Sequence, residues 1–148
     1  NLWYPLIGFQ QSIFFESQKW PRLCHSFGGA CDIDANKIII NAFSNLDKRV
    51  FFHWMTLNTH ANYDKRDILS DRVNCEKIGL VTDSDTCHYV KLHTQFFDNL
   101  VDILQNPHMK NVEVIIVGDH PPPMLNFIES VRNFKLEHVS WVHLRTKP

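Results

Sequence analysis

The sequence predicts an α/β fold in which helices flank a layered, mostly parallel sheet. Two observations support this prediction. Short apolar runs that suit buried strands alternate with a segment of helical periodicity, and polar residues follow the strands where open sheets gather ligands. A length of 148 residues is ordinary for one domain, and 44% hydrophobic residues supply enough apolar surface for a core. We therefore expect one domain over residues 1–148.

The first strands are predicted at residues 12–16 and 37–42, two short apolar runs flanked by turn residues. The segment between them, residues 17–36, contains a proline and a glycine pair and is expected to be an irregular loop. A further strand is predicted over residues 49–57, which are rich in aromatic and branched side chains. His60 would then lie just after the C-terminal end of this strand.

One amphipathic helix is predicted after the polar stretch 64–86, because apolar residues recur there at helical spacing. These residues are Tyr89, Leu92, Phe96, Leu100, Ile103 and Leu104, and Asn106-Pro107 ends the pattern. Residues 112–117 (VEVIIV) are the clearest buried strand, followed directly by Gly118-Asp119-His120. A short helix over residues 125–134 and a last strand over residues 139–144 complete the prediction.

The charge balance argues against several classes of partner. The chain has 15 lysine and arginine residues against 16 aspartate and glutamate residues, so no overall field attracts nucleic acid or an anionic membrane surface. No apolar run approaches the roughly 20 residues that cross a bilayer. Asn1 begins no signal peptide, and we expect the chain to be cut from a longer one whose anchor or export signal lies upstream.

The four cysteines form two local pairs, Cys24 with Cys31 and Cys75 with Cys87, each in a polar, turn-rich segment. Neither pair has the CxxC spacing of zinc ribbons or thioredoxin-like sites. Two short structural disulfides therefore fit this pattern and imply an oxidising compartment. The alternative is four unrelated reduced thiols in a cytosolic protein.

Asp119 and His120 are the first candidates for metal binding. They place a carboxylate oxygen and an imidazole nitrogen side by side after a strand, a pair of donors that suits zinc or manganese. On spacing alone, an Asp-His dipeptide at this position is more often a loop cap or a hydrogen-bonded pair. His138 and His143 flank the last strand and are predicted to be structural.

A six-residue apolar strand ending in Gly-Asp-His, preceded by a strand ending in Thr-His-Ala-Asn-Tyr, resembles the sulfatase-like branch of the alkaline phosphatase superfamily. Phosphoethanolamine transferases and lipoteichoic acid synthases show both elements in this order. The resemblance covers residues 6–145 and extends to both cysteine pairs and to the late strand at Val139-Ser140-Trp141-Val142. It implies that residues 1–148 are the C-terminal portion of one catalytic domain with an incomplete alkaline phosphatase-like sheet.

The resemblance also implies roles for individual residues. Asp119 and His120 would hold a zinc or manganese ion, calcium fitting this donor pair less well, and His60 would hydrogen-bond the phosphoryl oxygens or the leaving group of the substrate. Trp20 and Arg22 lie in a loop where relatives contact the substrate headgroup, and a guanidinium can grip a phosphate with two hydrogen bonds. The alternatives are a strand-capping role for His60 and a solvated Arg22 beside a partly buried Trp20.

The sequence departs from the family in two places. Relatives often continue Asp-His with Gly-Glu, whereas Pro121-Pro122-Pro123 follows here and stiffens the loop. The family's nucleophile, a threonine or a formylglycine precursor, lies further from the histidine than the 59 residues that precede His60 here. Thr56 and Thr59 are too close to His60 to take that role. We therefore expect the isolated chain to be inactive, with at most half of a metal site.

By resemblance, the longer protein is a metal-dependent transferase of a phosphoethanolamine or phosphoglycerol type group. Its threonine attacks a phosphoryl donor and the resulting phospho-enzyme passes the group to an acceptor hydroxyl or to water. Its partners would be a phosphorylated lipid headgroup donor and an envelope glycan or lipid acceptor, at the periplasmic or extracellular face of a bacterial inner membrane. Contact with the membrane would come only through a segment outside these residues. Two alternatives stay open: a sulfate ester hydrolase of the same superfamily, and a binding module that has lost the chemistry.

Overall fold

The longest element is the helix α3, Asp85–Leu104, which confirms the predicted amphipathic helix. The computed structural model describes residues 3–44 and 49–148. Ser84 caps the helix, because its hydroxyl accepts a hydrogen bond from the Cys87 N–H at 3.2 Å. Leu92 and Ile103 are almost completely buried on one face of α3, as the helical spacing of the apolar residues requires.

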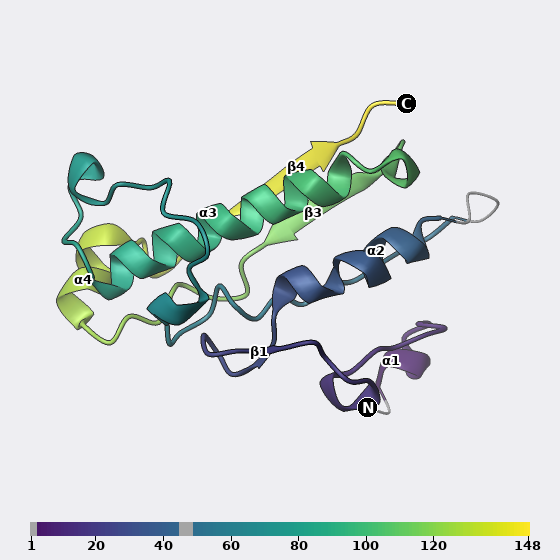
Figure 1. Ribbon diagram of the computed structural model, residues 1–148, viewed down its shortest axis with the longest axis horizontal. Helices are drawn as coiled ribbons and strands as arrows, with labels where there is room; N and C mark the ends of the chain where they lie inside the picture. Colours follow the sequence, from purple (N-terminus) through teal and green to yellow (C-terminus); the bar gives the residue numbers. More distant parts are fainter. Residues whose placement is uncertain (1–2, 45–48) are drawn as a thin grey trace.

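The other elements are short (Figure 1). The helices are α1 (Trp3–Leu6), α2 (Asn36–Ala42) and α4 (Phe127–Asn133), and the strands are β1 (Leu23–Cys24), β2 (Gly29–Ala30), β3 (Glu113–Val117) and β4 (Trp141–Arg145). Single 3-10 turns lie at Phe15–Ser17, Asp32–Ala35, Lys65–Asp67, Glu76–Ile78 and Pro107–Met109. The predicted strands near residues 112–117 and 139–144 and the predicted short helix near residues 125–134 are therefore present.

The predicted layered, mostly parallel sheet is wrong. The described residues form two separate two-stranded sheets, and both are antiparallel. β3 pairs with β4 in a register that sets Ile115 opposite His143 and Val117 opposite Trp141. The Gly118 N–H donates to the Ser140 carbonyl at 3.0 Å, so the chain leaving β3 is tied to the chain entering β4. This closure fixes the two strands in opposite directions.

Three of the predicted strands are not strands. Residues 37–42 lie in the helix α2, where the buried Ile39 packs against Ile103. A short apolar run suits either a buried strand or a buried helical turn, and here packing against α3 selects the helix. Residues 12–16 run partly into a 3-10 turn, and residues 49–57 have no regular secondary structure. Trp54 in the latter segment packs on Phe96 of α3, with ring centroids 5.8 Å apart.

The main hydrophobic core lies at the C-terminal end of α3. Ile39, Ile103 and Met109 are its buried members, and they bring together α2, α3 and the turn after α3. Phe52 and Trp54 cover this cluster from the irregular segment. A second tertiary link joins the two helices, because the Asn36 and Asn99 amides exchange hydrogen bonds of 2.6 and 3.0 Å.

The helix α4 lies at the opposite, N-terminal end of α3 (Figure 1). The Glu129 carboxylate accepts hydrogen bonds from the Thr86 N–H at 3.1 Å and from the Thr86 hydroxyl at 2.6 Å. A carboxylate at a helix N-terminus is favoured by the helix dipole and by the free N–H groups of the first turn. Phe134, just after α4, packs edge-on against Tyr89, with ring centroids 5.2 Å apart.

One face of the β3–β4 sheet carries three exposed apolar residues beside Glu113, His143 and Arg145. Ile115 is 70% exposed, Val117 64% and Trp141 67%. Each residue of β3 from Val114 to Val117 is apolar, a pattern typical of strands that are covered on both faces. This sheet therefore presents more apolar surface than a two-stranded sheet at the edge of a finished domain normally does.

His93 predicts a loss of stability in mild acid. Burial lowers its pKa below the usual 6.5, and its ring stacks on Tyr89 with centroids 3.9 Å apart. The unfolded chain then binds more protons than the folded chain below pH 6.5, so stability is present above this pH and is lost as the pH falls. Urea unfolding at about pH 7.5 and about pH 5.5 should show a larger loss for the wild type than for H93F. Equal losses would show that the pKa of His93 is the same in the folded and the unfolded chain.

Candidate functional site

Asp119 and His120 follow β3 directly, at the end of the strand that is tied to Ser140. The His120 N–H donates to Asp119 Oδ1 at 3.0 Å, and His120 Nε2 lies 3.5 Å from Asp119 Oδ2. The Asp119 side chain is 84% exposed and that of His120 is 43% exposed. The two donor atoms therefore face the same small space and are open to solvent.

His60 lies against this pair. Its backbone N–H donates to the Leu57 carbonyl at 3.0 Å, which turns the chain back after the irregular segment. The His60 and His120 rings meet edge to face, with centroids 5.1 Å apart and planes at 89°. Two histidines that are 60 positions apart in the chain are thus brought together, although the sheet that was expected to converge them is absent from the described residues.

Each of these histidines uses the same ring nitrogen for a local hydrogen bond. His60 Nδ1 lies 2.8 Å from the Ala61 carbonyl, and His120 Nδ1 lies 2.8 Å from the Pro121 carbonyl. A carbonyl oxygen can only accept, so both Nδ1 atoms carry the proton and donate. In the neutral imidazoles the Nε2 lone pairs are then free for a metal ion, a proton or a substrate hydroxyl.

The Asp119-His120 geometry fits one edge of a tetrahedral metal site. Donor atoms about 2.0–2.2 Å from a tetrahedral zinc ion lie about 3.4 Å from one another. The observed separation of Asp119 Oδ2 and His120 Nε2 is 3.5 Å. Within residues 3–44 and 49–148, no group of three or more histidine, cysteine, aspartate or glutamate side chains converges in a way that could hold a metal. The pair thus offers two possible donor atoms, and metal binding by them stays a prediction.

The segment before His60 is held by a buried carboxylate. Asp32 accepts hydrogen bonds from the Leu57 and Asn58 N–H groups, both at 2.9 Å, and its own N–H donates to the Asn58 side chain at 2.7 Å. Burial raises the pKa of Asp32, although the two backbone hydrogen bonds oppose this shift. These contacts fix where the His60 turn begins.

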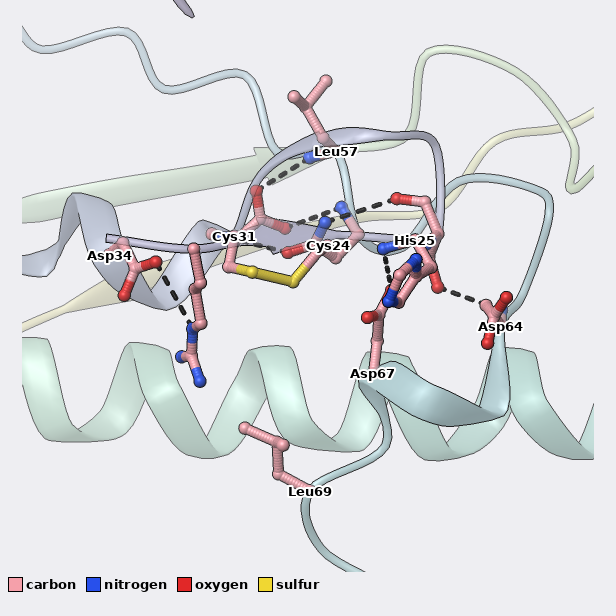
Figure 2. The surroundings of a disulfide bond; sticks show 12 residues. Cys24, His25, Cys31, Asp34, Leu57, Asp64, Asp67 and Leu69 are labelled. Atoms are coloured by element: carbon pink, nitrogen blue, oxygen red, sulfur yellow. Dashed lines mark hydrogen bonds and ion pairs between the residues drawn. A yellow bond between two sulfur atoms is a disulfide. The ribbon is translucent and has the colours of Figure 1, made fainter. Parts of the chain in front are cut away.

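The two predicted disulfides are confirmed. Cys24 pairs with Cys31 and Cys75 pairs with Cys87, with Cα–Cα distances of 5.1 and 5.8 Å. The first disulfide closes the small β1–β2 hairpin beside the Asp32 network (Figure 2). Two bonds of this kind fit a compartment that oxidises thiols.

The hairpin loop is anchored by Asp67. Its carboxylate points to the turn of the hairpin and accepts hydrogen bonds from the His25 and Ser26 N–H groups (Figure 2). Asp67 is only 6% exposed and Ser26 is fully buried. From this loop Phe27 projects onto His60, with ring centroids 4.5 Å apart.

Trp20 and Arg22 occupy different surroundings. The Trp20 indole N–H donates to the Phe15 carbonyl at 2.9 Å, so its polar atom is used within its own loop. The Arg22 guanidinium pairs with Asp34 at 3.4 Å and is 45% exposed. Arg22 does share a cavity of about 310 Å³ with Thr59, the residue before His60. The cavity thus lies next to the histidine pair rather than around it.

Sequence reasoning missed Phe27, Asp32, Asn58 and Asp67. Each acts through a tertiary contact between segments far apart in the chain, and no periodicity marks such a contact. One signal in the sequence could have identified Phe27: it precedes the pair Gly28-Gly29 in the loop between Cys24 and Cys31. Such loops hold short peptide segments in fixed conformations.

Comparison with known proteins gives no match: neither a family model, nor a curated protein, nor a solved structure resembles the chain closely enough to be reported. In the described part of the chain, none of the helices has the length and apolar character needed to cross a membrane.

Proposed function

We propose that the chain is the C-terminal part of a metal-dependent phosphoryl-group transferase of the sulfatase-like branch of the alkaline phosphatase superfamily. The group transferred is of the phosphoethanolamine or phosphoglycerol type. The observation that carries this proposal is the meeting of His60 with Asp119-His120, in which each ring uses Nδ1 for a backbone carbonyl and His120 Nε2 lies 3.5 Å from Asp119 Oδ2. The exposed apolar residues of β3–β4 support a place within a larger domain.

Asp119 and His120 are proposed to hold zinc or manganese. A nitrogen donor beside a single carboxylate suits these ions better than calcium, which prefers six or more oxygen ligands. Such an ion would lower the pKa of a hydroxyl bound to it and offset negative charge on the transferring group. The Nδ1–H bond to the Pro121 carbonyl orients the His120 ring so that Nε2 faces Asp119.

His60 is proposed to contact the phosphoryl group. Its Nε2 can donate to a phosphoryl oxygen when protonated and can accept from a hydroxyl when neutral. Arg22 and Trp20 are proposed to lie further out, where the cavity shared by Arg22 and Thr59 could receive a headgroup. In this proposal Arg22 exchanges its pairing with Asp34, whose side chain is 14% exposed, for a phosphate contact.

The substrates proposed are a phosphorylated lipid headgroup donor and an envelope glycan or lipid acceptor. The location proposed is the periplasmic or extracellular face of a bacterial inner membrane. The two disulfides support an oxidising location. The near balance of charge gives no reason to expect nucleic acid as a partner.

Zinc binding tests the ligand pair in the chain itself. We expect weak zinc binding by calorimetry, and we expect D119A and H120A each to weaken it at least about tenfold, because loss of a ligand costs no less than loss of an outer-shell contact. H143A is the matched control, since His143 is a similarly exposed histidine on β4. Equal zinc affinity in D119A and wild type would remove the metal assignment.

Transfer activity tests the function itself. In the longer protein that the proposal implies, turnover of a phospholipid headgroup donor should be abolished by D119A and strongly reduced by H60A. H143A should keep the wild-type rate. Wild-type turnover in D119A would refute the proposal, and hydrolysis of sulfate esters in preference to phosphoryl transfer would reassign the substrate class.

A further inference from the structure

We propose that Phe27 is a positioning residue that fixes the His60 ring against His120. This inference rests on the proposed function, because it assigns Phe27 a part in the site that His60 and His120 form. The three rings make a row: Phe27 and His60 centroids are 4.5 Å apart, and those of His60 and His120 are 5.1 Å apart. His60 is therefore held between an aromatic ring on one side and the candidate metal ligand on the other.

The backbone of Phe27 is in an unusual conformation. Its φ angle is +48°, in the left-handed region that is uncommon for any residue except glycine and is a genuine outlier for a bulky side chain. Gly28 and Gly29 follow directly and adopt this region more easily. Residues held in this way persist where the surroundings over-determine them, and they gather at functional sites.

The surroundings of Phe27 do over-determine it. The preceding Ser26 is fully buried, its N–H is bound to Asp67, its hydroxyl accepts from the Asp64 N–H at 3.0 Å, and its carbonyl accepts from the Asn58 amide at 3.3 Å. The Cys24–Cys31 disulfide closes the same loop. A side chain carried by this loop is thus presented on a rigid support.

The hairpin also approaches the His60 segment closely. A Cβ atom added at Gly29 would lie 3.3 Å from Leu57 Cδ1, tighter than an ordinary van der Waals contact. Leu57 in turn is bound through its backbone to Asp32 and begins the turn that carries His60. The distance between the Phe27 loop and the His60 turn is therefore set by the packing of the Leu57 side chain against the Gly29 backbone.

The exposure of Phe27 argues for a role beyond core packing. The side chain is 48% exposed, so a large part of the ring faces solvent beside the histidine pair. A phenylalanine that served only the core would be more deeply buried. With the Nδ1–H of His60 bound to the Ala61 carbonyl, contact with Phe27 restricts the remaining rotation of the imidazole. His60 Nε2 is then kept in one orientation for a substrate.

The test compares the oxidised chain with F27L and F27Y. Leucine keeps an apolar side chain of similar size without the ring, and tyrosine keeps the ring. We expect F27L to move the imidazole NMR resonances of His60, while those of His93 and the melting temperature stay at their wild-type values. F27Y should restore the His60 resonances. F51A, which removes an aromatic ring that is 82% exposed, is the matched control and should leave them unchanged.

Inorganic phosphate supplies the functional readout. In the presence of zinc, F27L should bind phosphate about tenfold more weakly than wild type, the effect typical of residues that orient a ligand, and F27Y should bind it as wild type does. Unchanged His60 resonances in F27L would overturn the positioning role. If wild type binds neither zinc nor phosphate while the F27L effect on His60 is present, the proposed function fails and the positioning role stands.

Discussion

Removing the Cys75–Cys87 disulfide by the double substitution C75A/C87A is expected to lower the free energy of unfolding by about 3 kcal/mol. The bond joins residues 12 positions apart, and its loss frees the unfolded chain to adopt many more conformations. Both cysteines are buried, Cys75 at 4% exposure and Cys87 at 1%. Urea unfolding without reductant measures the difference.

The disulfide also fixes the entrance to α3. Cys87 lies in the first turn of the helix, and the Cys75 carbonyl accepts hydrogen bonds from the Ile78 and Leu80 N–H groups at 3.1 and 2.9 Å. The segment before α3 is therefore folded around the bond. The wild-type protein under reducing conditions loses the Cys24–Cys31 bond as well, so it should be less stable than the double variant. A loss below about 1 kcal/mol would mean that this segment stays ordered in the unfolded chain.

The elements that sequence predicted well are those whose pattern is local. The helical spacing along α3 is a property of neighbouring residues, and the structure has this helix. The same holds for β3, where the four consecutive branched residues Val114 to Val117 favour an extended strand. Such sequence patterns predict an element reliably because one face of the helix, and one face of the strand, is more buried than the other.

The prediction was wrong where tertiary contacts determine the secondary structure or the strand direction. Ile38, Ile39 and Ile40 suit a buried strand or a buried helix, and the packing of Ile39 on Ile103 selects the helix α2. The antiparallel pairing of β4 with β3 joins segments that are far apart in the chain, and no sequence pattern specifies its direction. The parallel sheet was therefore an inference from alternation of elements, and alternation does not fix strand direction.

The candidate site was found for a reason that is only partly right. His60 and Asp119-His120 were expected to meet at the carboxyl edge of a parallel sheet. They meet instead where an irregular segment, anchored by Asp32, passes the end of the antiparallel β3. The polar residues after the predicted strands indicated which side chains lie close together. The parallel sheet that was expected to bring them together was wrong. The cysteine spacing was informative in the same local way, and both disulfides followed from it.

Replacing Asp67 with alanine is expected to lower the free energy of unfolding by about 3 kcal/mol, because the His25 and Ser26 N–H groups lose a shared buried acceptor and each unpaired group costs about 1–3 kcal/mol. D67N keeps an oxygen that can accept both hydrogen bonds and loses only their charge assistance. Its cost is expected to be about 1 kcal/mol. Urea unfolding of the three proteins gives both values.

Asp71 provides the matched control for this substitution. It is also paired, with Lys91, but its side chain is 79% exposed, so D71A is expected to cost less than about 1 kcal/mol. Amide hydrogen exchange adds a local readout, because D67A should expose the Ser26 N–H to exchange while the amides in the middle of α3 stay protected. Similar losses in D67A and D71A would mean that water replaces the carboxylate. A large loss of stability confined to D67A would instead show that the buried Asp67 carboxylate stabilises the loop that carries Phe27. This carboxylate accepts a hydrogen bond from Ser26, the residue directly before Phe27.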